Sequence, residues 1–193
     1  MTLVRPKSRE QLPETEPIFS MVEASMGFVP TSMLTMAHWP ELLQTFGAFA
    51  GNVLNSGKVD PGLKQLIAFV ISNSAGCRYC QAHTSHSAAK RGVSVEKINA
   101  AFEFETSDLF DEAERAALRV ALHAGMVPNA VEPTHMAALN EHYTARQCVE
   151  IVAVISLFGY LNRWNDTMAS TLEDKPVSFA STNLPSWEIG KHA

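Results

Sequence analysis

The fold of this chain is decided by residues 60–92, which read DPGLKQLIAFVISNSAGCRYCQAHTSHSAAKRG. Asp60 can cap a helix and the proline after it can open one, so the apolar run that follows predicts a helix over 61–71. Because a helix that is apolar on every side is usually buried, we expect this one at the centre of the core. Small polar residues then interrupt the pattern, and a second helix is predicted over 77–91, with Gly92 as its stop.

The rest of the chain also has the spacing and capping signals of helices, and no alternating pattern typical of strands competes with them. The predicted fold class is therefore all-α. We divide the chain into an N-terminal arm (1–20), one helical domain (21–173) and a C-terminal tail (174–193). Further helices are expected over 40–54, 94–102, 111–124 and 133–142, and from 144 onward.

A weak internal repeat has an offset of 85 residues. It aligns 65–70 with 150–155, and it places the segment 77–80 opposite 162–165. The repeat is compatible with two related helical hairpins, of which only one carries thiols. Two apolar helices can also align by chance, so both interpretations stay open.

Composition excludes several classes of function. The 193 residues carry a formal charge of −5, without a run of basic residues, so we expect no nucleic-acid partner. No apolar stretch is long enough to span a membrane, and the first residues lack the apolar core of a signal peptide. A cytoplasmic location is the expectation, and three cysteines in a reducing compartment do not suggest a disulfide scaffold.

The chemistry is expected in the second helix, where Cys77, Cys80, His83 and His86 recur every three residues. Neighbours at that spacing are adjacent on a helix, so the two cysteines can form a disulfide. A helix N-terminus favours negative charge and should lower the pKa of the thiols, and a histidine one turn on can take up the proton. The alternative is a purely structural role, in which cysteines pack as small apolar groups without reacting, and this is the interpretation that we favour for Cys148.

Zinc is a competing interpretation of the same four side chains, because their types are those of zinc ligands. Ligands that step by three along one continuous helix diverge rather than converge, so we predict no metal site there. No flavin, haem or nucleotide motif is visible either, so the predicted chemistry needs no bound cofactor.

The segment around these cysteines resembles the redox motif of the AhpD-like alkylhydroperoxidases, within the carboxymuconolactone decarboxylase superfamily. The resemblance extends over about residues 20–172. It implies an all-α fold and commonly a homo-oligomer, such as a trimer or hexamer. Outside the cysteine motif, the segments that resemble this family are Gly27–Pro30, His38–Leu43, Asp111–Arg115 and the helix from Glu150 to Asn162-Arg163.

The resemblance also implies roles. In peroxidase members the second cysteine attacks the peroxide and the first resolves it, which assigns these steps to Cys80 and Cys77. A glutamate and a histidine assist in the family, but Gln65 and Thr84 occupy those positions, so His83 or His86 would have to substitute. We expect Gln65 to be buried and to hydrogen-bond to the Cys77–Cys80 turn, directly or through a water, because an unpaired buried amide costs roughly 1–3 kcal/mol.

Three hypotheses follow. The first is a thiol-dependent peroxidase-like antioxidant protein, which takes a hydroperoxide and is reduced by an external dithiol such as a lipoyl group on a partner. The second is a lyase or isomerase acting on a small lactone or keto acid, as the superfamily name implies. The third is a non-catalytic helical assembly protein, compatible with the altered helper positions.

Overall fold

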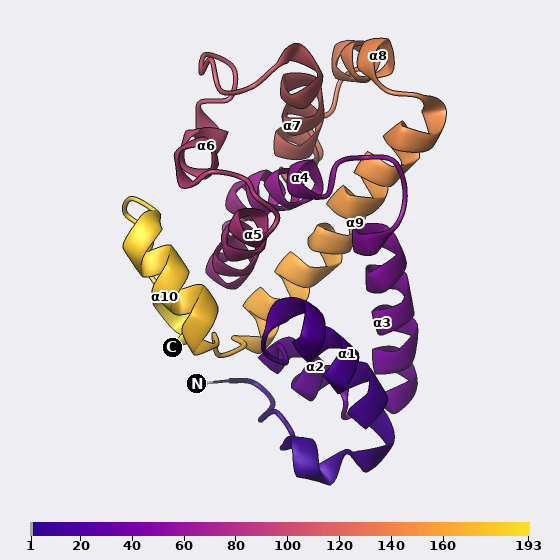
Figure 1. The fold of residues 1–193 in the computed structure, drawn as a ribbon, viewed down its shortest axis with the longest axis vertical. Coiled ribbons are helices and arrows are strands. Elements are labelled where there is room, and N and C mark those ends of the chain that lie inside the picture. Colours follow the sequence, from indigo (N-terminus) through magenta and orange to yellow (C-terminus); the bar gives the residue numbers. More distant parts are fainter. Residues whose placement is uncertain (1) are drawn as a thin grey trace.

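The computed structural model describes residues 2–193, which form α-helices and short 3-10 turns with no strand among them (Figure 1). The predicted all-α fold class is confirmed. The helices are α1 (Glu16–Met26), α2 (Thr31–Met36), α3 (Pro40–Asn55), α4 (Pro61–Ser74), α5 (Arg78–Lys90), α6 (Val95–Asn99), α7 (Glu112–Ala124), α8 (Pro133–His142), α9 (Ala145–Met168) and α10 (Asp174–Asn183).

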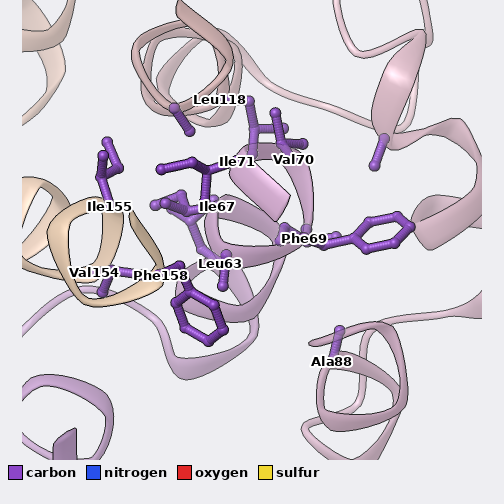
Figure 2. Close-up of a cluster of buried hydrophobic side chains, with 14 of the residues drawn as sticks. Leu63, Ile67, Phe69, Val70, Ile71, Ala88, Leu118, Val154, Ile155 and Phe158 are labelled. Carbon is purple, nitrogen blue, oxygen red and sulfur yellow. The ribbon is translucent and has the colours of Figure 1, made fainter. Parts of the chain in front are cut away.

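Helix α4 is the centre of the core, and it packs against α5, α7 and α9. Every residue from Gly62 to Ser72 is buried, as its apolar sequence predicts. Figure 2 shows Ile67 and its neighbours on α4 directed toward Leu118 of α7 and Ile155 of α9, with Phe69 pointing to the other side. The two helices of the segment 60–92 therefore form the frame around which the other helices assemble.

Local signals explain where these two helices begin and end. The carboxylate of Asp60 accepts a hydrogen bond from the N–H of Leu63 at 2.9 Å and caps α4. Helix α4 runs to Ser74, slightly beyond the predicted end, and Gly76 then takes a φ of +75° that reverses the chain before Cys77. Another left-handed glycine follows the end of α5, as the sequence predicts.

The N-terminal segment that we assigned to an arm folds onto the domain. Its two short 3-10 turns, Arg9–Gln11 and Pro13–Thr15, lead directly into α1, so residue 20 lies inside a helix. Leu12 and Phe19 are fully buried in a second apolar cluster, separate from the core around α4. That cluster also contains Met33, Met36, Ala37 and Leu43.

The C-terminal tail also packs on the domain. Helix α10 lies against α5, and the indole N–H of Trp187 donates to the carbonyl of Arg78 at 3.4 Å. The chain then returns to the end of α9, where the N–H of Leu172 donates to the carbonyl of His192 at 2.8 Å. The C-terminus lies near the end of α9 in Figure 1, and the last 3-10 turn, Gly190–His192, packs against α5.

A buried ion pair holds the turn between α3 and α4. Lys64 donates to the carbonyls of Val53 and Ser56 at 2.8 and 2.5 Å, and its Nζ lies 3.8 Å from Glu150 of α9. The Glu150 carboxylate accepts two backbone N–H groups from the turn after Gly57. Gly57 has a φ of +100°, and a Cβ there would lie 2.2 Å from Glu150 Oε2, so only glycine fits.

Candidate functional site

The two thiols lie at the first turn of α5, inside the protein. Cys77 is the N-cap residue, and its Sγ accepts a hydrogen bond from the N–H of Cys80 at 3.4 Å. Both are free cysteines, and Cys77 and Cys80 are only 0 and 2% exposed. The local sequence therefore brings the two cysteines together as predicted, and the tertiary fold buries both of them.

The side chain that contacts Cys80 from outside α5 is Asn165 of α9. Its amide nitrogen lies 3.5 Å from the Cys80 sulfur and donates to it. The two residues are 85 positions apart, which is the offset of the internal repeat. In the first copy the matched residues span the break between two helices, whereas in the second copy they lie on one continuous helix. The 85-residue offset thus aligns Cys80 with the residue that donates a hydrogen bond to its sulfur.

Burial changes the expected acidity of Cys80. Desolvation raises the pKa of this thiol well above its usual value, and the neighbouring Cys77 raises it further. The hydrogen bond from Asn165 acts in the opposite direction but is the smaller influence. The shift is therefore opposite in direction to the lowering that we expected from the helix N-terminus, and desolvation is its largest cause.

His83 lies one turn after Cys80, but its partner is Glu173. The Nε2 atom of His83 lies 2.6 Å from Glu173 Oε2, and the Tyr79 hydroxyl donates to Oε1 at 2.8 Å. The backbone N–H of Thr31 donates to the same oxygen at 2.5 Å. The ring of Tyr79 stacks on that of His83 with 4.3 Å between centroids. His83 is therefore held in a fixed orientation by an acid that the sequence did not single out.

Glu173 is an ionised carboxylate that is partly buried. Burial by itself would raise its pKa, but the charge of His83 and the hydrogen bonds from His83, Thr31 and Tyr79 outweigh burial and hold the pKa at about 2. No motif around Glu173 marks it in the sequence, because its partners lie 90 or more residues away. The structure thus supplies a carboxylate–histidine pair beside the thiols.

The other side of Cys77 faces Asp166 and His192. One ligand-type atom from each of these three side chains lies within 4.8 Å of the other two. The Nδ1 atom of His192 lies 2.9 Å from the carbonyl of Ser170, and its Nε2 lies 3.3 Å from Asp166 Oδ1. Both residues are distant from the cysteines in the sequence, and no local pattern predicted their place.

Three other residues with a role assigned from the sequence make no direct hydrogen bond to the sulfur of Cys77 or Cys80 within residues 2–193. Gln65 is buried, as expected, but within residues 2–193 its side chain makes no direct hydrogen bond to either cysteine, and Asn165 contacts Cys80 instead. His86 packs on the rings of Phe28 and Phe179, and burial lowers its pKa. Cys148 contacts Asn140 and the carbonyl of Tyr143 far from the site, so its sulfur is outside the thiol pair.

A pocket of about 590 Å³ adjoins the site between the ends of α4, α7 and α9. Its lining includes Asp166, which also faces Cys77, together with Arg163, Lys191 and Asn162. Asn162 is 4% exposed, and neither polar atom of its amide has a partner in the described part of the chain. The pocket thus has the cationic side chains of Arg163 and Lys191 in its lining, and it shares Asp166 with the surroundings of Cys77.

No helix in residues 2–193 combines the length and the apolar character needed to cross a membrane.

The fold and the site thus define an all-helical domain with two free thiols at the N-terminus of α5, and comparisons show which proteins it is similar to. The model of the carboxymuconolactone decarboxylase family matches residues 40–123. The uncharacterized protein YnjA of Escherichia coli (strain K12) is 31% identical over 110 residues, which are 57% of this chain and 60% of YnjA. The residues matched by the family model include both thiols, so this segment of the chain is similar to the carboxymuconolactone decarboxylase family.

Two solved structures are similar over most of the chain. The debrominase Bmp8, as a cysteine-to-alanine variant in complex with 2,3,4-tribromopyrrole, is 38% identical with a TM-score of 0.89, over 94% of this chain and 97% of Bmp8. The alkylhydroperoxidase AhpD core of a peroxidase-related protein from Ralstonia eutropha JMP134 has a TM-score of 0.80 at 23% identity, over 91% of this chain and 94% of that one. The second likeness concerns the fold alone.

Proposed function

We propose that this protein is a dithiol-dependent two-electron reductase, with hydroperoxides as the first substrate class. The observation that carries the proposal is the buried, free Cys77–Cys80 pair with Asn165 on one sulfur. The pair is close enough for a disulfide, and a polar partner beside Cys80 favours its ionised form.

The proposed reaction begins when the Cys80 thiolate attacks the distal oxygen of ROOH. The O–O bond breaks, ROH leaves after taking a proton, and Cys80 becomes a sulfenic acid. Cys77 then attacks that sulfur, water leaves, and the two sulfurs form a disulfide. An external dithiol, in the family a lipoyl group, restores both thiols by exchange and is itself oxidised to a disulfide.

Proton transfer is the difficult step at this site, because the pKa of Cys80 is raised by burial. The His83–Glu173 pair lies one helical turn away, and we assign it the role of accepting the thiol proton after a small movement of the ring. The fraction of thiolate grows as the pH approaches the pKa from below, so the peroxide reaction should accelerate as the pH rises above neutral.

The direct test is consumption of hydrogen peroxide or cumene hydroperoxide with dihydrolipoamide as reductant. Cys80→Ser should lose the activity, Cys77→Ser should stop after one turnover as a sulfenic acid, and Cys148→Ser should match the parent. Mass spectrometry of the oxidised parent should find a Cys77–Cys80 disulfide. Full activity in Cys80→Ser would rule the proposal out, and a reaction that persists without both thiols would favour the lyase or isomerase reading instead.

Gln65 offers a second test of the same site. A carboxylate at this position would restore a base that peroxidase members have, so Gln65→Glu should raise the rate if the protein is an impaired peroxidase. Gln81→Glu, on the buried face of α5, adds a carboxylate elsewhere and is the matched control. A lower rate in Gln65→Glu than in the parent would contradict this part of the mechanism.

A second candidate function is reductive dehalogenation of a brominated heteroaromatic ring. It is favoured by the similarity to the debrominase Bmp8 over nearly the whole of both chains. The same dithiol would supply the electrons, so that ArBr and two thiols give ArH, HBr and one disulfide. Bromide release from brominated pyrroles, measured against peroxide consumption in the same preparation, distinguishes the two substrate classes.

The expected homo-oligomer is also a proposal. Helix α9 presents the exposed apolar side chains of Val149 and Val152 on the surface, which a second copy could cover. Light scattering after size-exclusion chromatography should give the mass of a trimer or hexamer, and a monomer mass at all concentrations would oppose it.

A further inference from the structure

The cluster of Cys77, Asp166 and His192 has the ligand types of a site for a thiophilic divalent cation. It combines a sulfur, a carboxylate oxygen and an imidazole nitrogen, and it is the single group of three or more such residues in the described chain. The three residues come from the start of α5, from α9 and from the last turn before the C-terminus. Unlike four ligands along one helix, ligands from three separate elements can converge on one point.

The histidine is already oriented for coordination. A carbonyl oxygen can only accept, so the 2.9 Å contact with Ser170 places a proton on Nδ1 of His192. The other nitrogen, Nε2, faces Asp166 Oδ1 at 3.3 Å, a contact in which Nε2 must donate because a carboxylate oxygen only accepts. A cation bound between the two atoms would replace that proton. Metal-bound histidines characteristically donate their second N–H to a backbone carbonyl or carboxylate in this way.

The spacing of the atoms fits a small cation. Zn²⁺ binds nitrogen and oxygen at about 2.0–2.2 Å and sulfur at about 2.3 Å, so neighbouring ligands in a tetrahedron lie roughly 3.3–3.8 Å apart. The separation of 3.3 Å between His192 Nε2 and Asp166 Oδ1 already has that value. The largest separation within the cluster is no more than 4.8 Å, so binding requires a contraction of roughly 1 Å at most.

The burial of the candidate ligands, and the hydrogen bonds that hold them in place, also favour a cation site. Cys77 and His192 are fully buried, and the main chain of His192 is held by the hydrogen bond to Leu172. Lys191 binds Asp166 Oδ2 at 2.9 Å, which leaves Oδ1 directed toward the histidine. Asp166 also lines the pocket, so the site has a route of entry.

We propose that Cys77, Asp166 and His192 bind Zn²⁺, or a similar thiophilic divalent cation, with a fourth position left for water or a small ligand. Binding displaces the proton of the Cys77 thiol and leaves Cys80 outside the coordination sphere. If the proposed dithiol chemistry is correct, the metal-bound form is inactive, because Cys77 can no longer close the disulfide. The binding itself does not depend on that function.

The test is a Zn²⁺ titration of the reduced, metal-stripped protein in competition with a chromophoric chelator. We expect one Zn²⁺ per chain, and we expect His192→Ala and Asp166→Asn to bind at least about 100-fold more weakly, since even second-contact changes cost 10–100-fold. Cys148→Ser is the matched cysteine control and should bind as the parent does. Undiminished 1:1 binding in His192→Ala, or no binding by the parent at micromolar Zn²⁺, would overturn the proposal.

Co²⁺ gives a second readout that does not depend on the C-terminal variants folding. A thiolate-to-cobalt charge-transfer absorption should appear in the parent, disappear in Cys77→Ser and remain in Cys80→Ser. The reverse pattern, with loss in Cys80→Ser and retention in Cys77→Ser, would show that the metal binds elsewhere. Circular dichroism of each variant shows whether it is folded before metal is added.

Discussion

Replacing Glu173 by glutamine should remove a defined part of the stability of this protein. The carboxylate has three hydrogen-bond donors, in His83, Tyr79 and the backbone of Thr31, and its pKa is lowered from 4.5 to about 2. A difference of about 2.5 pKa units corresponds to about 3 kcal/mol of folding free energy at pH 7. Glutamine has nearly the same shape but cannot carry the negative charge that accepts these three hydrogen bonds.

The sign of the pH dependence follows from the direction of the shift. Because the pKa of Glu173 is lower in the folded than in the unfolded state, its contribution is fully present above about pH 4.5. It is lost as the pH falls toward 2. About half of the 3 kcal/mol should already be gone at pH 3. The stabilities of the parent and of Glu173→Gln should therefore converge in acid.

Urea unfolding followed by circular dichroism at pH 7, 5, 4 and 3 measures this effect. Glu141→Gln removes a carboxylate from the exposed surface of α8 and is the matched control, which should run parallel to the parent. If the gap between the parent and Glu173→Gln is the same at pH 7 and pH 3, the assignment of the low pKa to Glu173 is wrong.

Two further predictions concern the turn after α3 and the thiol. Gly57→Ala should destabilise the protein by at least about 1–3 kcal/mol in urea unfolding, because the new Cβ meets Glu150 at a positive φ. Gly51→Ala, inside α3 with open space around it, should instead stabilise by roughly 0.5–1 kcal/mol, and a stabilised Gly57→Ala would contradict the argument. Asn165→Leu removes the hydrogen-bond donor to the Cys80 sulfur, so the pKa of this thiol should rise. In protein that keeps Cys80 as its single cysteine, the midpoint pH of iodoacetamide alkylation should rise with it. The alkylation rate at pH 8 should be on the order of tenfold lower than with Asn165 present. A midpoint that moves to lower pH would refute the role of this hydrogen bond.

The helices and their ends follow from short stretches of sequence. Asp60, Ser94, Asp111 and Thr144 each cap the helix that the sequence predicts, through a hydrogen bond to a backbone N–H three residues on. Such bonds depend on neighbouring residues, so a local window of sequence determines them. The pairing of the two cysteines at the start of α5 has the same local origin.

The partners of the thiols follow from tertiary packing alone. Asn165, Glu173 and His192 are 85 or more residues away from the thiol or histidine that each one faces, and no local spacing connects them. The carboxylate beside His83 belongs to Glu173, the N-cap residue of α10, whereas position 65 of this chain is a glutamine.

The acidity of Cys80 shows most directly why sequence was insufficient. Its place in the first turn of a helix is local and favours the thiolate. Its burial depends instead on the helices that pack against α5, which include α4, α9 and α10. Burial is the larger influence and raises the pKa. The sequence determined that two thiols share a helix start, and the packing of distant helices decided how readily Cys80 ionises, because desolvation depends on everything that surrounds a group in space.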